Sequence, residues 1–241
     1  MNTSTVQSST GDPRKIGAAD VIARVIAVVV LLSLPFLAAG TLAWPQGLLY
    51  LGLLIFLTGG SRVLMARKYP DLVQERLHAA ERADSKTWDK PLSAIIGLWG
   101  TLVTWIAAGL NVRFDWSPAI PSELQVIGVI ALVFSTLFGT WAMLENRFFS
   151  AVVRIQTDRG HTVVTTGPYR LVRHPGYVAG IGGYLALPLL LNSLWSFIPA
   201  LLTIGLIIVR TQLEDKTLQA ELPGYQAYTQ RTRYRLLPGV W

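Results

Sequence analysis

Long apolar runs alternate with polar segments along this chain of 241 residues. Four runs approach the roughly 20 apolar residues that a helix needs to cross the core of a bilayer: residues 25–44, 48–66, 91–110 and 124–144. The first run exceeds the apolar region of a signal peptide, so we interpret it as a membrane anchor with a kink at Pro35. Arg62 interrupts the second run near its end, where a long side chain can reach the interface. The pattern therefore predicts four transmembrane helices.

A further apolar stretch, residues 178–209, contains no charged side chain. A single helix of that length would be about 48 Å long, well beyond a bilayer core of about 30 Å, whereas two full spans need about 40 residues. We therefore expect two short helices that fold back at Asn192 and Ser193, with polar ends that extend into the interface. The predicted fold is all-α and integral to the membrane: four transmembrane helices plus a C-terminal short helical hairpin, five to six spans in total.

The same pattern divides the chain into three parts. Residues 1–24 begin with a Ser- and Thr-rich stretch that lacks apolar periodicity, which predicts a disordered tail. Residues 25–144 form the four-span bundle, and residues 145–241 hold a long polar loop, the hairpin and a C-terminal segment. Residues 163–166 in that loop have strand-like propensity, but one short run does not establish a strand. No internal repeat and no second soluble domain are visible.

Composition and charge support a membrane protein. The chain is 51% hydrophobic and only 15% charged, with a mean hydropathy of +0.43. Of its 21 Lys and Arg residues, only Arg113 falls in a loop on the side opposite to the N-terminal tail. The positive-inside rule then places both termini and the large polar loop in the cytoplasm. Because this distribution is the one that topology demands, the net charge of +7 does not indicate nucleic-acid binding.

Several chemistries are excluded or disfavoured by residue content. The chain has no cysteine, so disulfides, thiolate catalysis and Cys-based zinc sites are excluded. Its three histidines occur in no HxxxH or HExxH spacing, and we therefore expect no metal site.

The segment of residues 167–177 lies directly before the hairpin and is rich in cationic and aromatic side chains. A proline disfavours the helical conformation of the residue before it and suits the first turn of a helix, so we expect an extended His174 and a helix that starts at Pro175. The free N–H groups at that helix start attract a carboxylate or a phosphate. Physical reasoning alone leaves Arg173 and His174 open between interfacial anchoring and ligand binding.

Two pairs of polar residues lie where apolar runs end. Arg210 and Glu214 are four residues apart and share one face of a helix, which fits either an exposed ion pair or a binding pair for anionic and cationic groups. Glu145 and Asn146 follow the fourth run, and helix termination at the interface is the better interpretation there.

The motifs from residue 145 to the C-terminus carry a resemblance to a known family. They are His161-Thr162-Val163-Val164, Gly167-Pro168-Tyr169, Arg173-His174-Pro175-Gly176-Tyr177, Arg210 with Glu214-Asp215, and Pro223-Gly224-Tyr225 with Tyr228. In this combination the chain resembles the isoprenylcysteine carboxyl methyltransferase family of integral membrane enzymes. Members of that family bind S-adenosylmethionine at the cytosolic membrane face without a Rossmann fold. This chain likewise has no GxGxxG motif after a strand.

The resemblance implies roles for particular residues. The cofactor would be lined by Gln156, His161, Thr162, Val163, Val164, Tyr169, His174, Pro175, Gly176, Tyr177 and Glu214. Arg210 would hold the carboxylate of the acceptor, and Arg210 and Glu214 form the predicted catalytic pair. The paired glutamates of the family are Glu214 and Asp215 here, and the Gly-x-x-Tyr element is offset by one residue. The roles of Asp215, Tyr225 and Tyr228 therefore stay open.

The implied reaction is methyl transfer from S-adenosylmethionine to a carboxylate of a lipophilic, isoprenylcysteine-like acceptor in the lipid bilayer. A carboxylate with a pKa near 4 is already ionised at neutral pH, so the enzyme would mainly position the acceptor. A phospholipid-type N-methyltransferase, a sterol-type membrane reductase and a non-enzymatic membrane protein stay open as alternatives. Arg210 favours an acid over an amine acceptor, and the absence of charged residues in the middle of the apolar runs disfavours an ion pathway.

Overall fold

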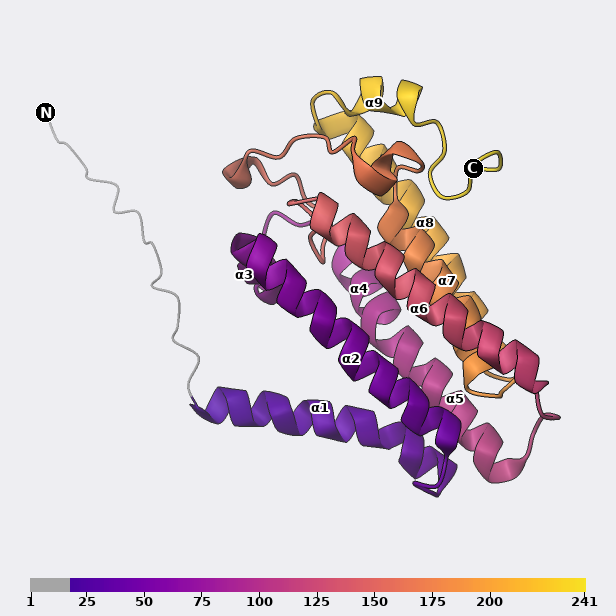
Figure 1. Cartoon of the computed structure of the whole chain (residues 1–241). Helices are drawn as coiled ribbons and strands as arrows, with labels where there is room; N and C mark the ends of the chain where they lie inside the picture. The colour runs from indigo at the N-terminus through magenta and orange to yellow at the C-terminus, as the bar shows by residue number, and fades with distance from the viewer. Residues whose placement is uncertain (1–17) are drawn as a thin grey trace, which may run out of the picture. The chain divides into compact units, whose positions relative to one another are not determined.

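The computed structural model of this protein describes residues 18–241, and every regular element in that range is a helix (Figure 1). The predicted all-α fold is confirmed. The chain forms two units, Met1–Ser33 and Leu34–Trp241. Helix α1 (Ala18–Ala39) begins within the predicted tail and stays helical through Pro35. The remainder of that predicted tail, residues 1–17, lies outside the described residues.

Within residues 18–241, four helices are long and apolar enough to cross a membrane. They are α2 (Pro45–Lys68), a continuous helix over Asp89–Phe114, α6 (Ser122–Glu145) and α8 (Phe197–Glu221). The helix over Asp89–Phe114 consists of α4 (Asp89–Ala94), the π-helical η2 (Ile95–Gly100) and α5 (Thr101–Phe114). The second, third and fourth predicted spans are thus confirmed, and Val25–Ala39 of α1 is a shorter apolar helix.

The predicted hairpin is formed by α7 (Pro175–Leu190) and α8. The chain reverses at Asn192, which adopts a left-handed conformation with φ of 56°. The side chain of Asn192 accepts a hydrogen bond of 2.6 Å from the backbone N–H of Ile120, which ties the turn to the loop before α6. Beyond Arg210 the polar part of α8 continues to Glu221, so the second helix of the hairpin extends past its apolar run as expected.

Short elements connect and follow the long helices. They are α3 (Pro70–Leu77), η1 (Ala79–Glu81), η3 (Thr157–Arg159), η4 (Gly167–Arg170) and α9 (Tyr225–Arg231). Among the described residues there is no strand, and residues 163–166 run as irregular loop. These short elements supply the polar side chains of one end of the bundle.

The π-helical segment η2 faces the hairpin closely. The hydroxyl of Tyr184 on α7 donates to the backbone carbonyl of Ile96 and lies 3.0 Å from the hydroxyl of Thr101. A Cβ on Gly100 would lie 2.6 Å from Thr203 of α8 and 2.9 Å from the Tyr184 hydroxyl, so only glycine permits this approach. π-Helical turns often mark functional sites. Here Ile96 and its neighbours form part of a cavity wall.

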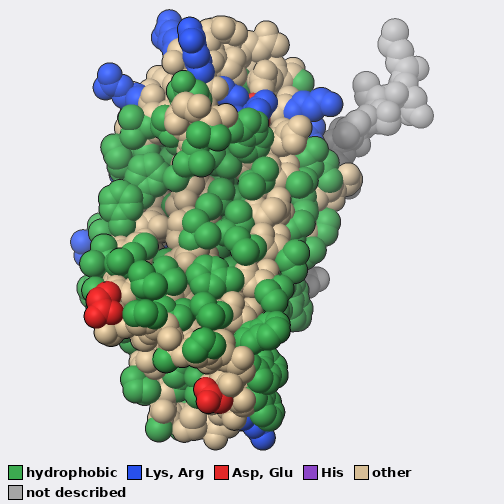
Figure 2. Space-filling model, turned by 90° about the vertical axis from the view of Figure 1, so that its right-hand side faces the viewer, with side chains coloured by type: hydrophobic (Ala, Val, Ile, Leu, Met, Phe, Trp, Pro, Cys, Tyr) green, Lys and Arg blue, Asp and Glu red, His purple; other side chains and the backbone are tan. Residues whose placement is uncertain are grey.

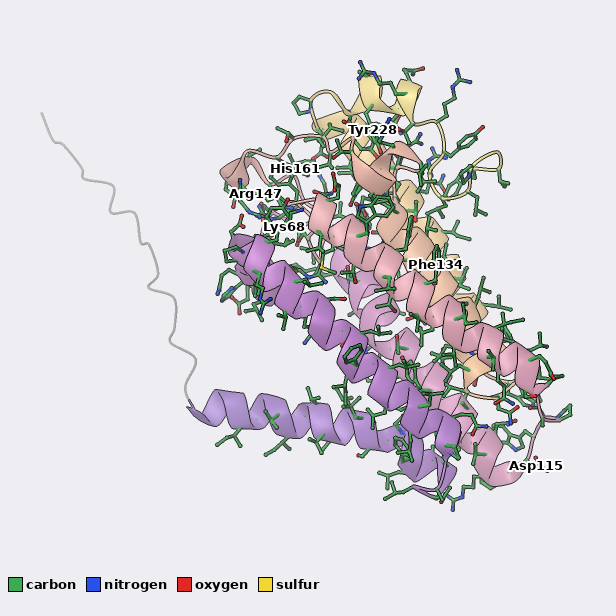
Figure 3. The ribbon with its side chains drawn as sticks, viewed as in Figure 1. Lys68, Asp115, Phe134, Arg147, His161 and Tyr228 are labelled. Atoms are coloured by element: carbon green, nitrogen blue, oxygen red, sulfur yellow. The ribbon has the colours of Figure 1, made fainter. Side chains whose placement is uncertain are left out.

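Polar and apolar side chains separate along the unit Leu34–Trp241. Figure 2 shows an apolar body with most of the visible Lys and Arg side chains gathered at one end. Figure 3 places Lys68, Arg147, His161 and Tyr228 at that end and Asp115 at the opposite end. Phe134, between them on α6, is 69% exposed, as suits a side chain that faces lipid. The loops that carry the predicted site therefore share one end of the helix bundle, which we call the basic end.

Candidate functional site

A cavity of about 600 Å³ lies at the basic end. Its walls come from α3 and η1, from α4 with η2, from the loop after α6, from the start of α7, and from the second half of α8 with α9. Every site residue predicted from the sequence lines it: Gln156, His161, Thr162, Val163, Val164, Tyr169, His174, Pro175, Gly176, Tyr177, Arg210 and Glu214. The fold thus brings all of them together, while their binding roles stay predictions.

The start of α7 forms as the proline indicates. His174 is the residue before the helix, with φ of −124° and ψ of 63°, which is non-helical but less extended than expected, and Pro175 is the first helical residue. The backbone N–H groups of Arg173 and His174 donate to carbonyls of the C-terminal segment, at 2.9 and 3.0 Å. A Cβ on Gly176 would lie 2.7 Å from the Phe149 ring, so glycine lets this ring close against the helix start.

The sequence left the role of Asp215 open, and the structure shows which groups its side chain contacts. Its carboxylate is fully buried and accepts two hydrogen bonds from Arg173, at 2.8 and 3.1 Å. The side chain of Arg235 donates at 2.8 Å, and the hydroxyl of Tyr225 donates at 3.0 Å. The His174 Nε2 atom lies 3.1 Å from the same carboxylate. Asp215 therefore ties the start of α7 to α8, α9 and the C-terminal segment, and Arg173 is a buried ion-pair partner rather than a surface anchor.

The two tyrosines of α9 have separate partners. Tyr225 donates to Asp215, whereas the hydroxyl of Tyr228 donates to the backbone carbonyl of Tyr169 at 2.7 Å. Both rings are buried and line the cavity, with ring centroids 5.4 Å apart. Burial raises the pKa of the Tyr228 hydroxyl to about 12, so this group stays protonated as a donor at neutral pH. Tyr228 thus ties α9 to η4, and Tyr225 ties α9 to α8.

Arg210 is held in one orientation by a carboxylate that sequence reasoning missed. Its Nε donates to Asp89 Oδ1 at 2.7 Å, and its Nη2 donates to Asp89 Oδ2 at 3.2 Å and to the carbonyl of Ala151 at 3.0 Å. The guanidinium lies 5.4 Å from the centroid of the Tyr177 ring. Within residues 18–241, no hydrogen-bond acceptor partners Nη1 of Arg210. Nη1 is thus the part of the guanidinium that is left for a ligand.

Asp89 has further bonds that fix its position. It is fully buried and accepts a hydrogen bond of 2.6 Å from the backbone N–H of Val153, and a second of 3.1 Å from the Ser93 hydroxyl. Asp89 therefore connects the start of α4, the loop after α6 and α8 through one carboxylate.

Glu214 has a different partner from Arg210. The hydroxyl of Tyr177 donates to its carboxylate. Arg210 and Glu214 both line the cavity, and no ion pair joins them in the part of the chain that the structure describes. The interpretation as an exposed pair along α8 does not hold, because Arg210 is 12% exposed and pairs with Asp89.

The loop after α6 is organised by Gln156 and His161. Gln156 is buried; its Nε2 donates to the carbonyl of Phe148 at 2.8 Å, and its carbonyl accepts from Arg159. The His161 ring lies 4.6 Å from the Phe148 ring, centroid to centroid. Burial, together with the nearby Arg154 and Arg159, lowers the pKa of His161 to about 4. His161 is therefore neutral at pH 7 and presents an uncharged ring to the cavity.

The connection between α2 and α4, together with α4 itself, also supplies cavity residues that sequence reasoning missed. Arg76, Lys90 and Ser93 line the cavity. Buried Arg154, on the loop after α6, pairs with Glu75 of α3 at 2.8 Å, which holds this connection against the loop. The segment between residues 67 and 90 carries charges of both signs. Such a segment beside a membrane indicates ion pairing, which is the signal in the sequence that could have located Arg76 and Lys90. Asn146 follows the end of α6 as expected and donates to the Tyr169 hydroxyl at 3.1 Å.

Comparison with known proteins identifies a family whose model matches part of this chain. Residues 124–222 match the model of a family described as phospholipid methyltransferase. The matched segment contains every site residue predicted from the sequence. Together with the helices long enough to span a bilayer, this match supports a membrane methyltransferase.

Two similar proteins carry names from metal resistance. The Cobalt-zinc-cadmium resistance protein CzcN of Cupriavidus metallidurans is 31% identical over 143 residues, which cover 57% of this chain and 61% of the relative. The Nickel-cobalt-cadmium resistance protein NccN of Alcaligenes xylosoxydans xylosoxydans is 25% identical over 142 residues, which cover 57% and 62%. The chain thus spans less than two thirds of either relative. Residues 18–241 hold no group of three or more His, Cys, Asp or Glu side chains that could bind a metal ion.

Proposed function

We propose that this protein transfers a methyl group from S-adenosylmethionine to a carboxylate of a lipophilic, isoprenylcysteine-like acceptor. The observation that carries the proposal is the convergence, in one cavity, of all the residues whose motifs resemble the isoprenylcysteine carboxyl methyltransferase family. The match to a methyltransferase family over the same segment supports it.

The size and the lining side chains of the cavity support a site for S-adenosylmethionine. Its volume of about 600 Å³ falls within the range of small-molecule sites, about 300–1,000 Å³. The carboxylate of Glu214 suits a cationic or hydroxyl-bearing group, and Lys90 suits a carboxylate. The neutral His161 beside Phe148 suits a flat heterocycle. When bound, the cofactor supplies an electrophilic methyl group on a positively charged sulfur.

Arg210 would orient the acceptor. An acceptor carboxylate is ionised at neutral pH and needs no base, so the work of the protein is to fix its position and direction. Asp89 and the carbonyl of Ala151 hold the guanidinium from one side, which leaves Nη1 to donate to the acceptor. The Tyr177 ring packs against the same guanidinium and shields it from water.

A second cavity supports a lipophilic acceptor. It has a volume of about 590 Å³ and is lined by α2, α3, α6 and α7. Both cavities share Arg76, Leu77, Phe149, Ala151 and Gly176 in their walls, so they adjoin. We infer that the apolar part of the acceptor lies in this second cavity while its reacting group reaches the first.

We further propose that the basic end faces the cytoplasm. Most Lys and Arg side chains visible in Figure 2 gather there, and the positive-inside rule favours that orientation. In this orientation a polar cofactor would reach the first cavity from the cytosol.

One observation favours a lipid amine as a second candidate acceptor. Asp89 compensates the charge of Arg210, and the carboxylate of Glu214 lines the same cavity. An amine must lose a proton before it attacks the methyl group, and a carboxylate close by can take that proton. The match to a phospholipid methyltransferase model is consistent with this candidate.

Labelling of native membranes tests the proposal and separates the two acceptors. Purified protein is incubated with native membranes and methyl-labelled S-adenosylmethionine, and labelled lipids are identified by mass spectrometry. We expect a labelled lipid that releases its label as methanol in mild base, because a carboxyl methyl ester is hydrolysed there. A label that survives base in the lipid would identify the amine candidate instead, and no labelled product at all would contradict methyl transfer.

A further inference from the structure

We propose that Arg62 of α2 and Arg76 of α3 form an anion-binding site in the second cavity, which holds the phosphate of a bound lipid. Arg76 also lines the first cavity and has Arg210 as a charged neighbour, whereas Arg62 lines only the second cavity. The inference does not depend on whether the bound lipid is the methyl acceptor.

The second cavity has the shape of a site for a lipid chain. It lies among α2, α6 and α7, which belong to the apolar body, and α6 packs against both neighbours (Figure 1). Its α7 wall consists of small residues: Gly176, Ala179, Gly180 and Gly183. A Cβ on Gly183 would meet only the tip of Leu132, at 4.0 Å, so the space above this glycine is open. An apolar chain fits such a wall without displacing other side chains.

Both arginines line this cavity, and neither has a carboxylate partner. Within residues 18–241 no Asp or Glu oxygen lies within ion-pair distance of Arg62 or Arg76, and no acidic residue lines the cavity. In the described part of the chain, the Arg76 side chain donates only to the backbone carbonyl of Phe149, at 3.1 Å, and its guanidinium lies 5.7 Å from the ring of the same residue.

Arg62 is exposed and Arg76 is partly buried, whereas three other buried or partly buried arginines near the two cavities are compensated. Arg154 pairs with Glu75, Arg173 with Asp215 and Arg210 with Asp89. Burial, and then the neighbouring Arg62 and Arg210, lower the pKa of Arg76. An uncompensated cation is costly at the partly buried Arg76, and an anion between it and the exposed Arg62 would remove that cost.

Phosphate at the membrane interface fits both the chemistry and the depth of this pair. The guanidinium fork of arginine matches phosphate oxygens in a bidentate manner. Arg62 lies six residues before the end of α2 at Lys68, which is about 9 Å along the helix. That depth is close to the boundary between headgroups and hydrocarbon, where the phosphate of a lipid lies next to its acyl chains.

Binding of a short-chain acidic lipid tests the site. The detergent-purified full chain is titrated with dioctanoyl phosphatidic acid, and with dioctanoylglycerol, which has the same chains and no phosphate. We expect the variant Arg62→Gln/Arg76→Gln to bind the phosphatidic acid at least about tenfold more weakly, because it loses the charged hydrogen bonds to the phosphate. Binding of the neutral lipid should not change. The control Arg170→Gln removes an exposed cation outside the second cavity and should bind both lipids like the wild type.

Further variants separate the lipid from free phosphate and from misfolding. Gly183→Leu fills the cavity and should weaken binding of the phosphatidic acid, whereas Gly205→Leu, at an exposed glycine with no neighbour within 4 Å, should not. Inorganic phosphate at millimolar concentration should fail to displace the lipid. Equal wild-type affinity for both lipids, equal losses in Arg170→Gln, or displacement by phosphate alone would each overturn the inference. S-adenosylhomocysteine binding reports the fold and the first cavity. Because Arg76 lines that cavity too, this control is measured on the single variant Arg62→Gln, whose residue lines only the second cavity, so failure of the proposed function shows separately.

Discussion

Arg210→Ala is expected to lower methyl transfer by about 100-fold or more, because loss of a group that orients a reactant has effects of that size. Binding of S-adenosylhomocysteine should stay within about threefold of the wild type, since the bonds of Arg210 run to Asp89 and Ala151 and its free Nη1 is assigned to the acceptor. Initial rates with the labelled cofactor and calorimetric titration of the same preparation measure the two effects.

Matched variants distinguish the contribution of the position of the Arg210 guanidinium from that of its positive charge. Arg210→Lys keeps the positive charge but loses the fork, and it should remain strongly impaired. Asp89→Asn keeps the shape of the residue that holds Arg210 and should lower the turnover while leaving cofactor affinity nearly unchanged. Parallel losses of turnover and cofactor binding in Arg210→Ala would contradict a role at the acceptor, as would full activity.

Asp215→Ala is expected to destabilise the protein by about 3–5 kcal/mol, the usual effect of removing one partner from a buried ion pair. The change leaves Arg173 and Arg235 without their shared carboxylate and removes the acceptor of the Tyr225 hydroxyl. Unfolding in mixed detergent micelles, followed by tryptophan fluorescence, measures the free energy of unfolding.

Asp158→Ala is the matched control for this stability effect. Asp158 also accepts from a buried arginine, Arg154, but its own side chain is 48% exposed, and such pairs contribute about 0–1 kcal/mol. Equal destabilisation by the two substitutions would show that Asp215 is not the centre of a buried network.

Most of the fold could be predicted because bilayer thickness constrains helix length. The apolar runs located α2, the helix over Asp89–Phe114, and α6, and the length of residues 178–209 predicted the hairpin that reverses at Asn192. The π-helical turn η2 could not be predicted, because it accompanies contacts with Tyr184 and Thr203 on the distant hairpin. Local sequence carries no sign of such contacts.

The predicted site residues share one cavity because their motifs flank the start of α7 and the second half of α8, which pack together. Asp89 could not be predicted, since its partner Arg210 lies 121 positions further along the chain. In the sequence Asp89 is one charge among many between residues 67 and 90. The structural role of Asp215 was likewise hidden, because an Asp beside Glu214 gives no sign of which carboxylate is buried.

Calorimetric titration of the detergent-purified protein with S-adenosylmethionine and with S-adenosylhomocysteine tests the methyltransferase assignment most directly. We expect both to bind with dissociation constants on the order of micromolar. Binding of neither molecule by a folded preparation would contradict the methyltransferase function.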